Sequence, residues 1–258
     1  ILASALYTGS DLIPYTLYNG ISIAESNVRS QKKIGKDFKS LTYLIDLLAQ
    51  KKDNIALSLH PNISDLRPFQ WYNYNFADKK KFEINLQYTG IINIKIYDSF
   101  DEYLKTIRTV RRQEYKKSIN TNLKIYSSDD IDTFIQLYKL TFERQKLKIH
   151  NEQLVRSILK SLLSSNSGEI VFCLDQGNNA ISSVVICHDH NCSYYLFGAS
   201  DPNFRDLNPN TFLILESIKQ AFTKDKEFFD FCGVNSPFRG DFKLSFNANI
   251  VPYFNVRL

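Results

Sequence analysis

The chain has 258 residues, of which 43% are hydrophobic and 23% charged, and it carries a net charge of +5. These values are ordinary for a globular protein and allow one large domain or two small ones. No apolar run approaches the roughly 18 residues that cross a bilayer, so we expect no membrane span. Residues 1–7 lack a basic leader and the four cysteines lack CxxC spacing, so we expect a cytoplasmic chain with reduced thiols.

The first 50 residues combine strand patterns with one helix. Residues 1–7 and 15–23 are rich in β-forming side chains and are punctuated by Pro14 and Gly20. A helix is predicted over residues 38–50, because apolar side chains recur there at helical spacing. These side chains are Phe38, Leu41, Ile45 and Leu48.

Strand patterns continue to residue 96. Residues 54–59 alternate before a His-Pro stop, and residues 82–96 read as strand material broken at Thr89-Gly90. Between these segments lies an aromatic cluster, which consists of Phe69, Trp71, Tyr72, Tyr74 and Phe76.

Three helices and a short strand are predicted next. The first helix places apolar side chains on one face over residues 100–110, with Asp98 or Ser99 as its N-cap. Residues 123–126 form a short strand. Apolar periodicity then predicts helices over residues 131–142 and 154–162.

The last part of the chain returns to strands. A Gln-Gly-Asn-Asn turn joins strand patterns at residues 169–175 and 180–188 into a hairpin. The later elements are a strand at 193–198, an apolar helix at 212–222, a strand at 228–231 and strand-like segments at 244–256. This order predicts an α+β fold with a central, mixed and largely antiparallel sheet.

A basic segment lies between residues 103 and 128. It holds seven basic residues and one acid, so its net charge exceeds that of the whole chain. Such a stripe attracts the phosphates of a nucleotide, a carrier lipid or a nucleic acid, or it is a solvated helix face. The segment does not alternate aromatic and basic side chains in a stacking pattern, so we do not expect sequence-specific DNA binding.

Residues 198–211 join a strand to the apolar helix. Asn208 is the expected N-cap and Pro209 the first helical residue. A helix N-terminus binds anions, and Arg205 adds a positive charge nearby. The segment is therefore a candidate site for the pyrophosphate of CoA, or an ordinary capped loop.

Residues 229–248 carry polar side chains on turns that follow a strand. Asn235, Ser236 and Arg239 lie in this segment. Asp230 stands between two aromatic residues on a strand that we expect to be buried. A carboxylate there is either a base or positioning group, or the partner of Arg239 or Lys243 in a structural ion pair.

A Cys-His-Asp-His-Asn-Cys run at residues 187–192 resembles a zinc site only superficially. It joins two apolar strands, and its cysteines do not have metal-ligand spacing. We therefore expect a hairpin tip and no metal site. Fingerprints for a serine hydrolase, a zinc protease, a P-loop and a Rossmann fold are missing as well.

Four segments together resemble FemAB-like proteins of the GNAT superfamily. The run Arg-Arg-Gln-Glu-Tyr-Lys-Lys-Ser at 111–118 lies where these proteins carry a basic helix, and residues 198–211 are similar to their strand–loop–helix element. Phe-Asp-Phe-Cys-Gly at 229–233 looks like their penultimate strand. Gly-Asp-Phe-Lys-Leu-Ser-Phe-Asn-Ala at 240–248 resembles their closing motif, with Asn247 where Gly is commoner.

The resemblance implies two GNAT-like domains in tandem. We expect residues 1–128 to form an N-terminal domain that lacks its start, and residues 129–258 to form a C-terminal domain with the donor site. In such folds a strand splays from its neighbour and the acyl donor lies in the gap. Here the splayed pair would be residues 193–198 and 228–233.

The resemblance also implies roles for individual residues. Acyl-CoA would be the donor, and a sugar or cell-envelope precursor would supply the amine acceptor. Asp230 is expected to be a base or orienting group, Tyr195 an alternative proton carrier, and Lys243 a partner for substrate phosphate or developing charge. The donor residues would be Arg205, Asn208, Asn210 and Thr211. The acceptor residues would be Arg111, Arg112, Asn235, Ser236 and Arg239.

Two other functions stay open. FemAB relatives take amino acids from aminoacyl-tRNA, but such an enzyme needs a larger basic face than this sequence offers. A non-catalytic binding protein with the same fold is the third reading, because the base is not obvious and Asn247 replaces Gly. The sequence does not indicate an oligomeric state.

Overall fold

A computed structural model describes residues 3–5, 11–12, 14–15, 18–19, 21–23, 30–149, 151–237 and 239–258. The chain divides into two compact units. Unit 1 comprises Ile1–Thr89 with Val251–Leu258, and unit 2 comprises Gly90–Ile250. Strands β4 (Glu83–Asn93) and β10 (Asn249–Arg257) contribute residues to both units. Within the described ranges, no helix is long and apolar enough to cross a membrane.

Unit 1 packs one long helix against short strands. Its elements are β1 (Ala3–Ala5), β2 (Ile21–Ile23), α1 (Ser30–Lys51), β3 (Ala56–Ser58), α2 (Arg67–Gln70) and parts of β4 and β10. Strands β1 and β2 pair antiparallel, and β3 pairs antiparallel with the end of β10. The predicted helix is confirmed, although α1 begins eight residues before residue 38. β1 and β2 cover residues 3–5 and 21–23 of the predicted strands 1–7 and 15–23. Most of the remaining residues of these two predicted strands lie outside the described residues.

The core of unit 1 follows from the periodicity of α1. Leu41 and Ile45 are each 1% exposed and pack with Leu57 of β3, Phe69 of α2 and Val256 of β10. One face of the long helix is thus buried by residues from strands and from α2.

Unit 2 holds most of the regular structure. Its strands are the end of β4, β5 (Lys124–Ser127), β6 (Gly168–Leu174), β7 (Ala180–His188), β8 (Cys192–Ser200), β9 (Phe228–Asp230) and the start of β10. Its helices are η1 (Ile94–Ile96), α3 (Phe100–Thr106), α4 (Thr109–Asn120), α5 (Ile131–Arg144), α6 (Glu152–Ser164), η2 (Pro202–Leu207), α7 (Pro209–Thr223) and α8 (Gly240–Leu244).

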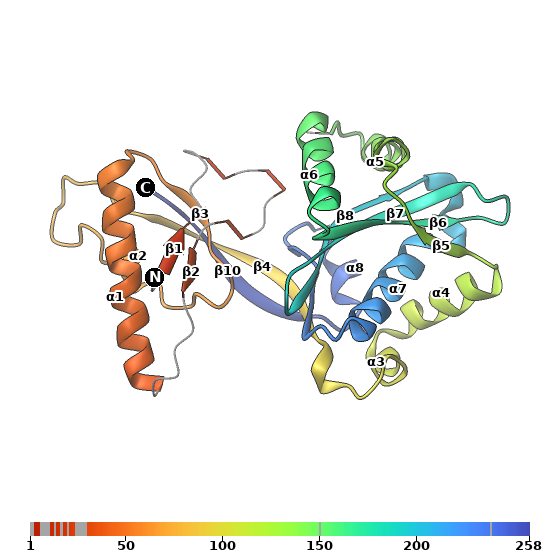
Figure 1. The fold of residues 1–258 in the computed structure, drawn as a ribbon, viewed down its shortest axis with the longest axis horizontal. Coiled ribbons are helices and arrows are strands. Elements are labelled where there is room, and N and C mark those ends of the chain that lie inside the picture. Colours follow the sequence, from red (N-terminus) through yellow and green to blue (C-terminus); the bar gives the residue numbers. More distant parts are fainter. Residues whose placement is uncertain are drawn as a thin grey trace. The chain divides into compact units, whose positions relative to one another are not determined.

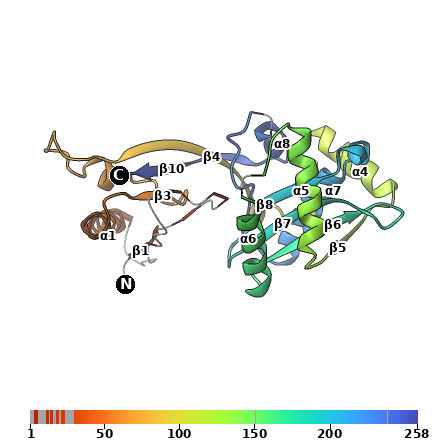
Figure 2. The same ribbon diagram turned by 90° about the horizontal axis from the view of Figure 1, so that it is seen from above.

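The strands form one mixed sheet in the order β3-β10-β4-β9-β8-β7-β6-β5. β5 to β8 pair antiparallel in succession, β4 pairs antiparallel with β9, and β8 pairs parallel with β9. In unit 2, α5 and α6 lie on one face of the sheet, and α3, α4 and α7 lie on the other (Figures 1 and 2). The predicted α+β fold with a largely antiparallel sheet is confirmed.

Two predicted elements differ from the structure. β4 runs unbroken through Gly90, where a Cβ would lie 3.2 Å from both Ala248 and Val234, so this glycine permits close packing and does not interrupt the strand. The helix predicted over residues 100–110 is two helices. α3 ends at Thr106, because Ile107 has extended backbone (ψ 161°), and α4 starts at Thr109.

The unit boundary also lies earlier than the expected division between residues 128 and 129. α3 and α4 belong to unit 2 because Tyr103 of α3, Tyr115 of α4 and Ile107 between the two helices are buried in the same core as α7. The apolar pattern of a single helix does not show which core it packs into, and the domain division expected between residues 128 and 129 stays a prediction beside these contact-defined units.

Candidate active site

The pairing of β8 with β9 stops after the first third of β8. Residues Cys192, Ser193 and Tyr194 pair in parallel with Phe228, Phe229 and Asp230, and β8 then continues alone on that side to Ser200. On its other side the register against β7 shifts between Tyr195 and Phe197, which is a β-bulge. The two strands therefore part in the segment where the sequence predicted a splayed pair.

A strained turn follows the end of β9. Cys232 has a φ of 56°, which is uncommon for a residue with a side chain, and Gly233 follows with a φ of 98°. The carboxylate of Asp230 is buried, and its Oδ1 accepts a hydrogen bond of 2.8 Å from the Cys232 amide. Asp230 thus fixes the backbone of this turn.

The turn holds the side chain of Lys243, which extends from α8. Its Nζ donates to the carbonyl oxygen of Phe231 at 2.6 Å and to that of Gly233 at 2.9 Å. Burial lowers the pKa of Lys243 from 10.5 to about 8, because an ammonium loses hydration there. A lysine with two fixed acceptors has one further N–H to offer when it is protonated.

Tyr195 lies beside this lysine. The Lys243 Nζ is 5.3 Å from the centroid of the Tyr195 ring, and the ring also contacts Phe231 at a centroid distance of 6.0 Å. The Tyr195 hydroxyl lies directly on Gly198, where any Cβ would overlap it. Burial raises the pKa of Tyr195 to about 12, so this hydroxyl keeps its proton at neutral pH.

The loop after Gly233 supplies a positive charge. The Nε of Arg239 donates to the Ser236 hydroxyl at 3.5 Å. Its exposed positive charge opposes part of the rise that burial causes in the pKa of Tyr195, and it adds to the lowering that burial causes in the pKa of Lys243. Asn235 lies next to Gly233, with its amide nitrogen 3.7 Å from the position of a Cβ on that glycine. The sequence-predicted residues Asp230, Tyr195, Lys243, Asn235, Ser236 and Arg239 are thus brought into one region.

The start of α7 uses its side chains to hold the helix in place. Asn208 precedes Pro209 as expected, but it has a φ of 56° and its side chain does not cap the helix. The Asn210 side chain accepts from Ser182 at 2.6 Å and donates to Ser200 at 3.3 Å. Thr211 donates to Glu114 at 2.6 Å. What this terminus can offer an anion is its first-turn amides, which have no partner within the helix.

Arg111 and Arg112, the acceptor candidates in the basic segment, have different neighbours. Arg111 is 16% exposed at its side chain, forms an ion pair of 2.6 Å with Glu114, and lies 4.8 Å from the Phe242 ring centroid. Its buried Nε has no hydrogen-bond partner among the described residues. Arg112 instead donates to the Lys105 carbonyl and the Thr109 hydroxyl, so it links α3 to α4. The basic segment itself spans α3, α4 and β5 and is not a single helix.

The Cys-His-Asp-His-Asn-Cys run forms the turn between β7 and β8. His188 contacts Ser193 at 2.9 Å and Glu169 at 3.1 Å, and Cys192 is buried. No group of three or more potential metal ligands occurs in the part of the chain that the structure describes.

The sequence profile described as "Acetyltransferase (GNAT) domain" matches residues 96–243, which is more than half of the chain. The chain belongs to the GNAT acetyltransferase family. The match lies within unit 2 and includes the parting strands, the start of α7 and Lys243. A search of curated proteins finds no match.

Solved structures share the fold of this GNAT protein. A structure titled as FemX superposes with a TM-score of 0.68 at 14% identity, over 94% of this chain and 82% of that one. A conserved protein of unknown function from Bacteroides thetaiotaomicron gives a TM-score of 0.58 at 11% identity, over 86% and 75% of the two chains. At these identities the likeness concerns the fold. The expected resemblance to FemAB-like GNAT proteins is confirmed at that level.

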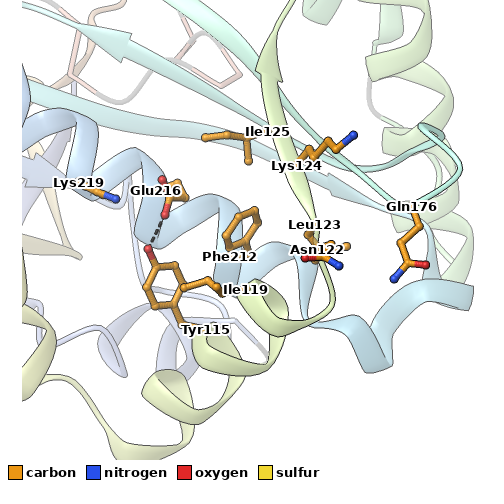
Figure 3. A pocket seen from close by; sticks show the side chains of 10 residues that line it. All are labelled: Tyr115, Ile119, Asn122, Leu123, Lys124, Ile125, Gln176, Phe212, Glu216 and Lys219. Carbon is orange, nitrogen blue, oxygen red and sulfur yellow. Dashed lines mark hydrogen bonds between the residues drawn. The ribbon is translucent and has the colours of Figure 1, made fainter.

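A hollow of about 700 Å³ lies on the GNAT domain, away from the candidate site, between α4, α7 and the edge strand β5 (Figure 3). Tyr115 and Phe212 line its apolar part, and Lys124, Gln176 and Lys219 lie at its polar part. The Tyr115 hydroxyl donates to Glu216, and burial raises the pKa of this tyrosine. None of the residues that the sequence singled out as catalytic, donor or acceptor groups lines this pocket.

The sequence missed the groups that hold Lys243. They are the backbone carbonyls of Phe231 and Gly233, and no pattern of side chains in the sequence predicts them. The available signal was the turn sequence Asp-Phe-Cys-Gly, in which a carboxylate two residues before a turn position can accept its amide.

Proposed function

We propose that this GNAT protein transfers an acyl group from a CoA-type thioester to an amine of a sugar or cell-envelope precursor. The observation that carries the proposal is the position of Lys243, held by two carbonyl oxygens where β8 and β9 part, beside the neutral Tyr195. Membership of the family makes acyl transfer the reaction to test at this place.

The donor would bind along β8 with its phosphates at the start of α7. Arg205 is exposed in η2 and is the charged side chain we assign to those phosphates. Asn208, Asn210 and Thr211 would contribute mainly backbone, because the Asn210 and Thr211 side chains already bond within the protein. The close approach of Tyr195 to Gly198 shapes the strand that the thioester arm would follow.

The site then supports a direct transfer. The acceptor nitrogen attacks the thioester carbonyl, the C–N bond forms, and the C–S bond breaks with the electron pair leaving on sulfur. The third N–H of protonated Lys243 is directed at the negative charge that develops on the carbonyl oxygen. Tyr195 donates its proton to the leaving thiolate, and the proton lost by the amine restores the hydroxyl.

Asp230 is an orienting group in this proposal. Its buried carboxylate accepts the Cys232 amide and so fixes the turn whose carbonyls hold Lys243. Arg239, Asn235 and Ser236 would face the acceptor from the following loop. Arg111 would join them, because its guanidinium lies against Phe242, the neighbour of Lys243 in α8. Arg112 is bonded to α3 and is the weakest of the acceptor candidates.

An aminoacyl group carried on tRNA is the second candidate donor. It is favoured by the similarity of the fold to FemX over 94% of this chain and by the FemAB-like sequence motifs. The same chemistry at Lys243 and Tyr195 would serve an ester, so the donor alone distinguishes the two functions.

The test is a transfer assay with acetyl-CoA, longer acyl-CoAs and aminoacyl-tRNA against a panel of amino sugars. Lys243→Met should lower kcat by about 10²- to 10³-fold, which is typical of the loss of one oxyanion donor. Lys160→Met, which removes an exposed lysine from α6, should leave kcat unchanged. Equal activity of both variants would remove Lys243 from the site, and transfer only from aminoacyl-tRNA would select the second donor.

A further inference from the structure

An exposed aromatic and basic loop lies in unit 1, between α2 and β4. We call residues 71–81 the aromatic loop. Three of its aromatic side chains are exposed within six residues, with exposed fractions of 53% for Trp71, 68% for Tyr74 and 51% for Phe76. Side chains of this size are costly to expose to water, and a cluster of them marks an interaction surface.

The outward orientation of these rings is built into the fold. The neighbouring aromatic residues face inward, since Phe69 is 1% exposed and Phe82 packs on both Phe69 and Tyr72 at ring distances of 5.3 and 5.4 Å. The sequence cluster therefore separates into an anchoring set and a displayed set. The displayed set contributes little to the core of unit 1.

Hydrogen bonds fix the aromatic loop in this shape. Asn73 has a φ of 55°, and its side chain donates to the Lys80 carbonyl at 2.9 Å, which closes the loop. The Phe76 amide donates to the Asn73 carbonyl at 3.0 Å. Lys80 in turn reaches the Asp53 carbonyl at 3.2 Å beyond the end of α1. The rings are thus presented by a pre-formed loop.

The aromatic loop is also basic. Lys79, Lys80 and Lys81 are all exposed and begin three residues after Phe76, while Asp78 is the single acid of the loop. A short cluster of Trp, Tyr and Phe beside several lysines matches the boundary of an anionic bilayer, where rings enter the headgroup region and lysines meet lipid phosphates.

We propose that the aromatic loop binds the surface of an anionic lipid bilayer. Nucleic acid is disfavoured because bases need open ring faces for stacking. The Arg67 guanidinium lies 5.6 Å from the Trp71 centroid and the Lys79 Nζ lies 4.2 Å from the Phe76 centroid, so one face of each of these two rings is already covered by a cation.

Tryptophan fluorescence measures binding at this surface directly, because Trp71 is the single tryptophan of the chain. Adding vesicles of 70% phosphatidylcholine and 30% phosphatidylglycerol to the whole protein should shift the Trp71 emission to shorter wavelength. The same vesicles should protect Trp71 from an aqueous quencher. Pure phosphatidylcholine vesicles should have a much smaller effect, and added salt should reduce the shift.

Variants separate the aromatic from the basic contribution. Tyr74→Ser with Phe76→Ser should weaken vesicle partitioning by at least about tenfold, whereas Ile96→Ser with Leu147→Ser, which removes equally exposed apolar side chains elsewhere, should not. Lys79→Gln with Lys81→Gln should also weaken it by on the order of tenfold. Lys146→Gln with Lys148→Gln makes the same change in net charge and serves as the control.

Three results would overturn the proposal. One is an unchanged Trp71 spectrum with every vesicle composition. Another is a shift caused by a single-stranded RNA oligonucleotide and not by vesicles, which would assign the aromatic loop to nucleic acid. The third is a shift that depends on protein concentration without lipid, which would assign it to a second copy of the chain.

Discussion

Replacing Lys243 by Met tests whether its ammonium is buried in the folded protein. Met fills nearly the same volume but has no charge and cannot donate to the carbonyls of Phe231 and Gly233. Removing the buried charge stabilises the folded protein. The two carbonyl oxygens, however, lose hydrogen bonds of 2.6 and 2.9 Å, and this loss offsets part of the gain.

The pH dependence of the free energy of unfolding separates the effect of the Lys243 charge from the effect of these hydrogen bonds. The pKa of Lys243 falls from 10.5 to about 8 on folding, which corresponds to about 3 kcal/mol. Between these pH values the unfolded chain carries the proton and the folded protein does not, so the free energy of unfolding rises with pH. Below pH 8 both states are protonated, and the whole cost of burying the ammonium is present.

The assay is urea unfolding of both proteins at intervals from pH 7 to pH 10.5. The free energy of unfolding of the wild type, minus that of Lys243→Met, should increase by up to about 3 kcal/mol over this range. Buried thiols such as Cys173, whose pKa is raised by burial, act in the opposite direction but are present in both proteins. A difference that stays constant with pH would refute a buried Lys243 ammonium.

Three further substitutions test neighbouring groups. Asp230→Asn should keep kcat within about tenfold, because an amide oxygen can still accept the Cys232 amide, whereas a catalytic base would lose far more; kinetics at fixed pH decides this. Gly198→Ala should lower stability by about 1–3 kcal/mol through overlap with the Tyr195 hydroxyl, and Tyr195→Phe in that background should recover part of the loss in a double-mutant cycle. Asn210→Ala should lower stability by about 1–2 kcal/mol through its lost bonds to Ser182 and Ser200, with the affinity for acyl-CoA unchanged; a loss of affinity at full stability would make Asn210 a donor ligand instead.

The sequence predicted the elements whose periodicity is imposed by burial on one face. The helix at residues 38–50 is an example, because Leu41 and Ile45 must both enter the core of unit 1. The hairpin at the Gln-Gly-Asn-Asn turn is another, since the turn residues fix the pairing of β6 with β7. Strand pairing across the parting of β8 and β9 came from the family resemblance, since periodicity does not state which strands are neighbours.

The residues of the candidate site could be predicted from the sequence, but most of the hydrogen bonds that they form could not. Lys243, Tyr195 and Asp230 were identified from motif position, but the carbonyls that hold Lys243 belong to a backbone turn with positive φ at Cys232. Asn210 and Thr211 look like ligand groups in sequence, whereas their side chains bond to Ser182 and Glu114 across the fold. Such long-range bonds depend on tertiary packing, which local patterns do not encode.

The most direct test of the proposed donor is isothermal titration of acetyl-CoA and longer acyl-CoAs, with free CoA for comparison. We predict saturable binding that weakens by about tenfold in Arg205→Ala and is unchanged in Arg144→Ala, an exposed arginine at the end of α5. Absence of binding at every acyl chain length would contradict a CoA-type donor and direct the search to aminoacyl-tRNA.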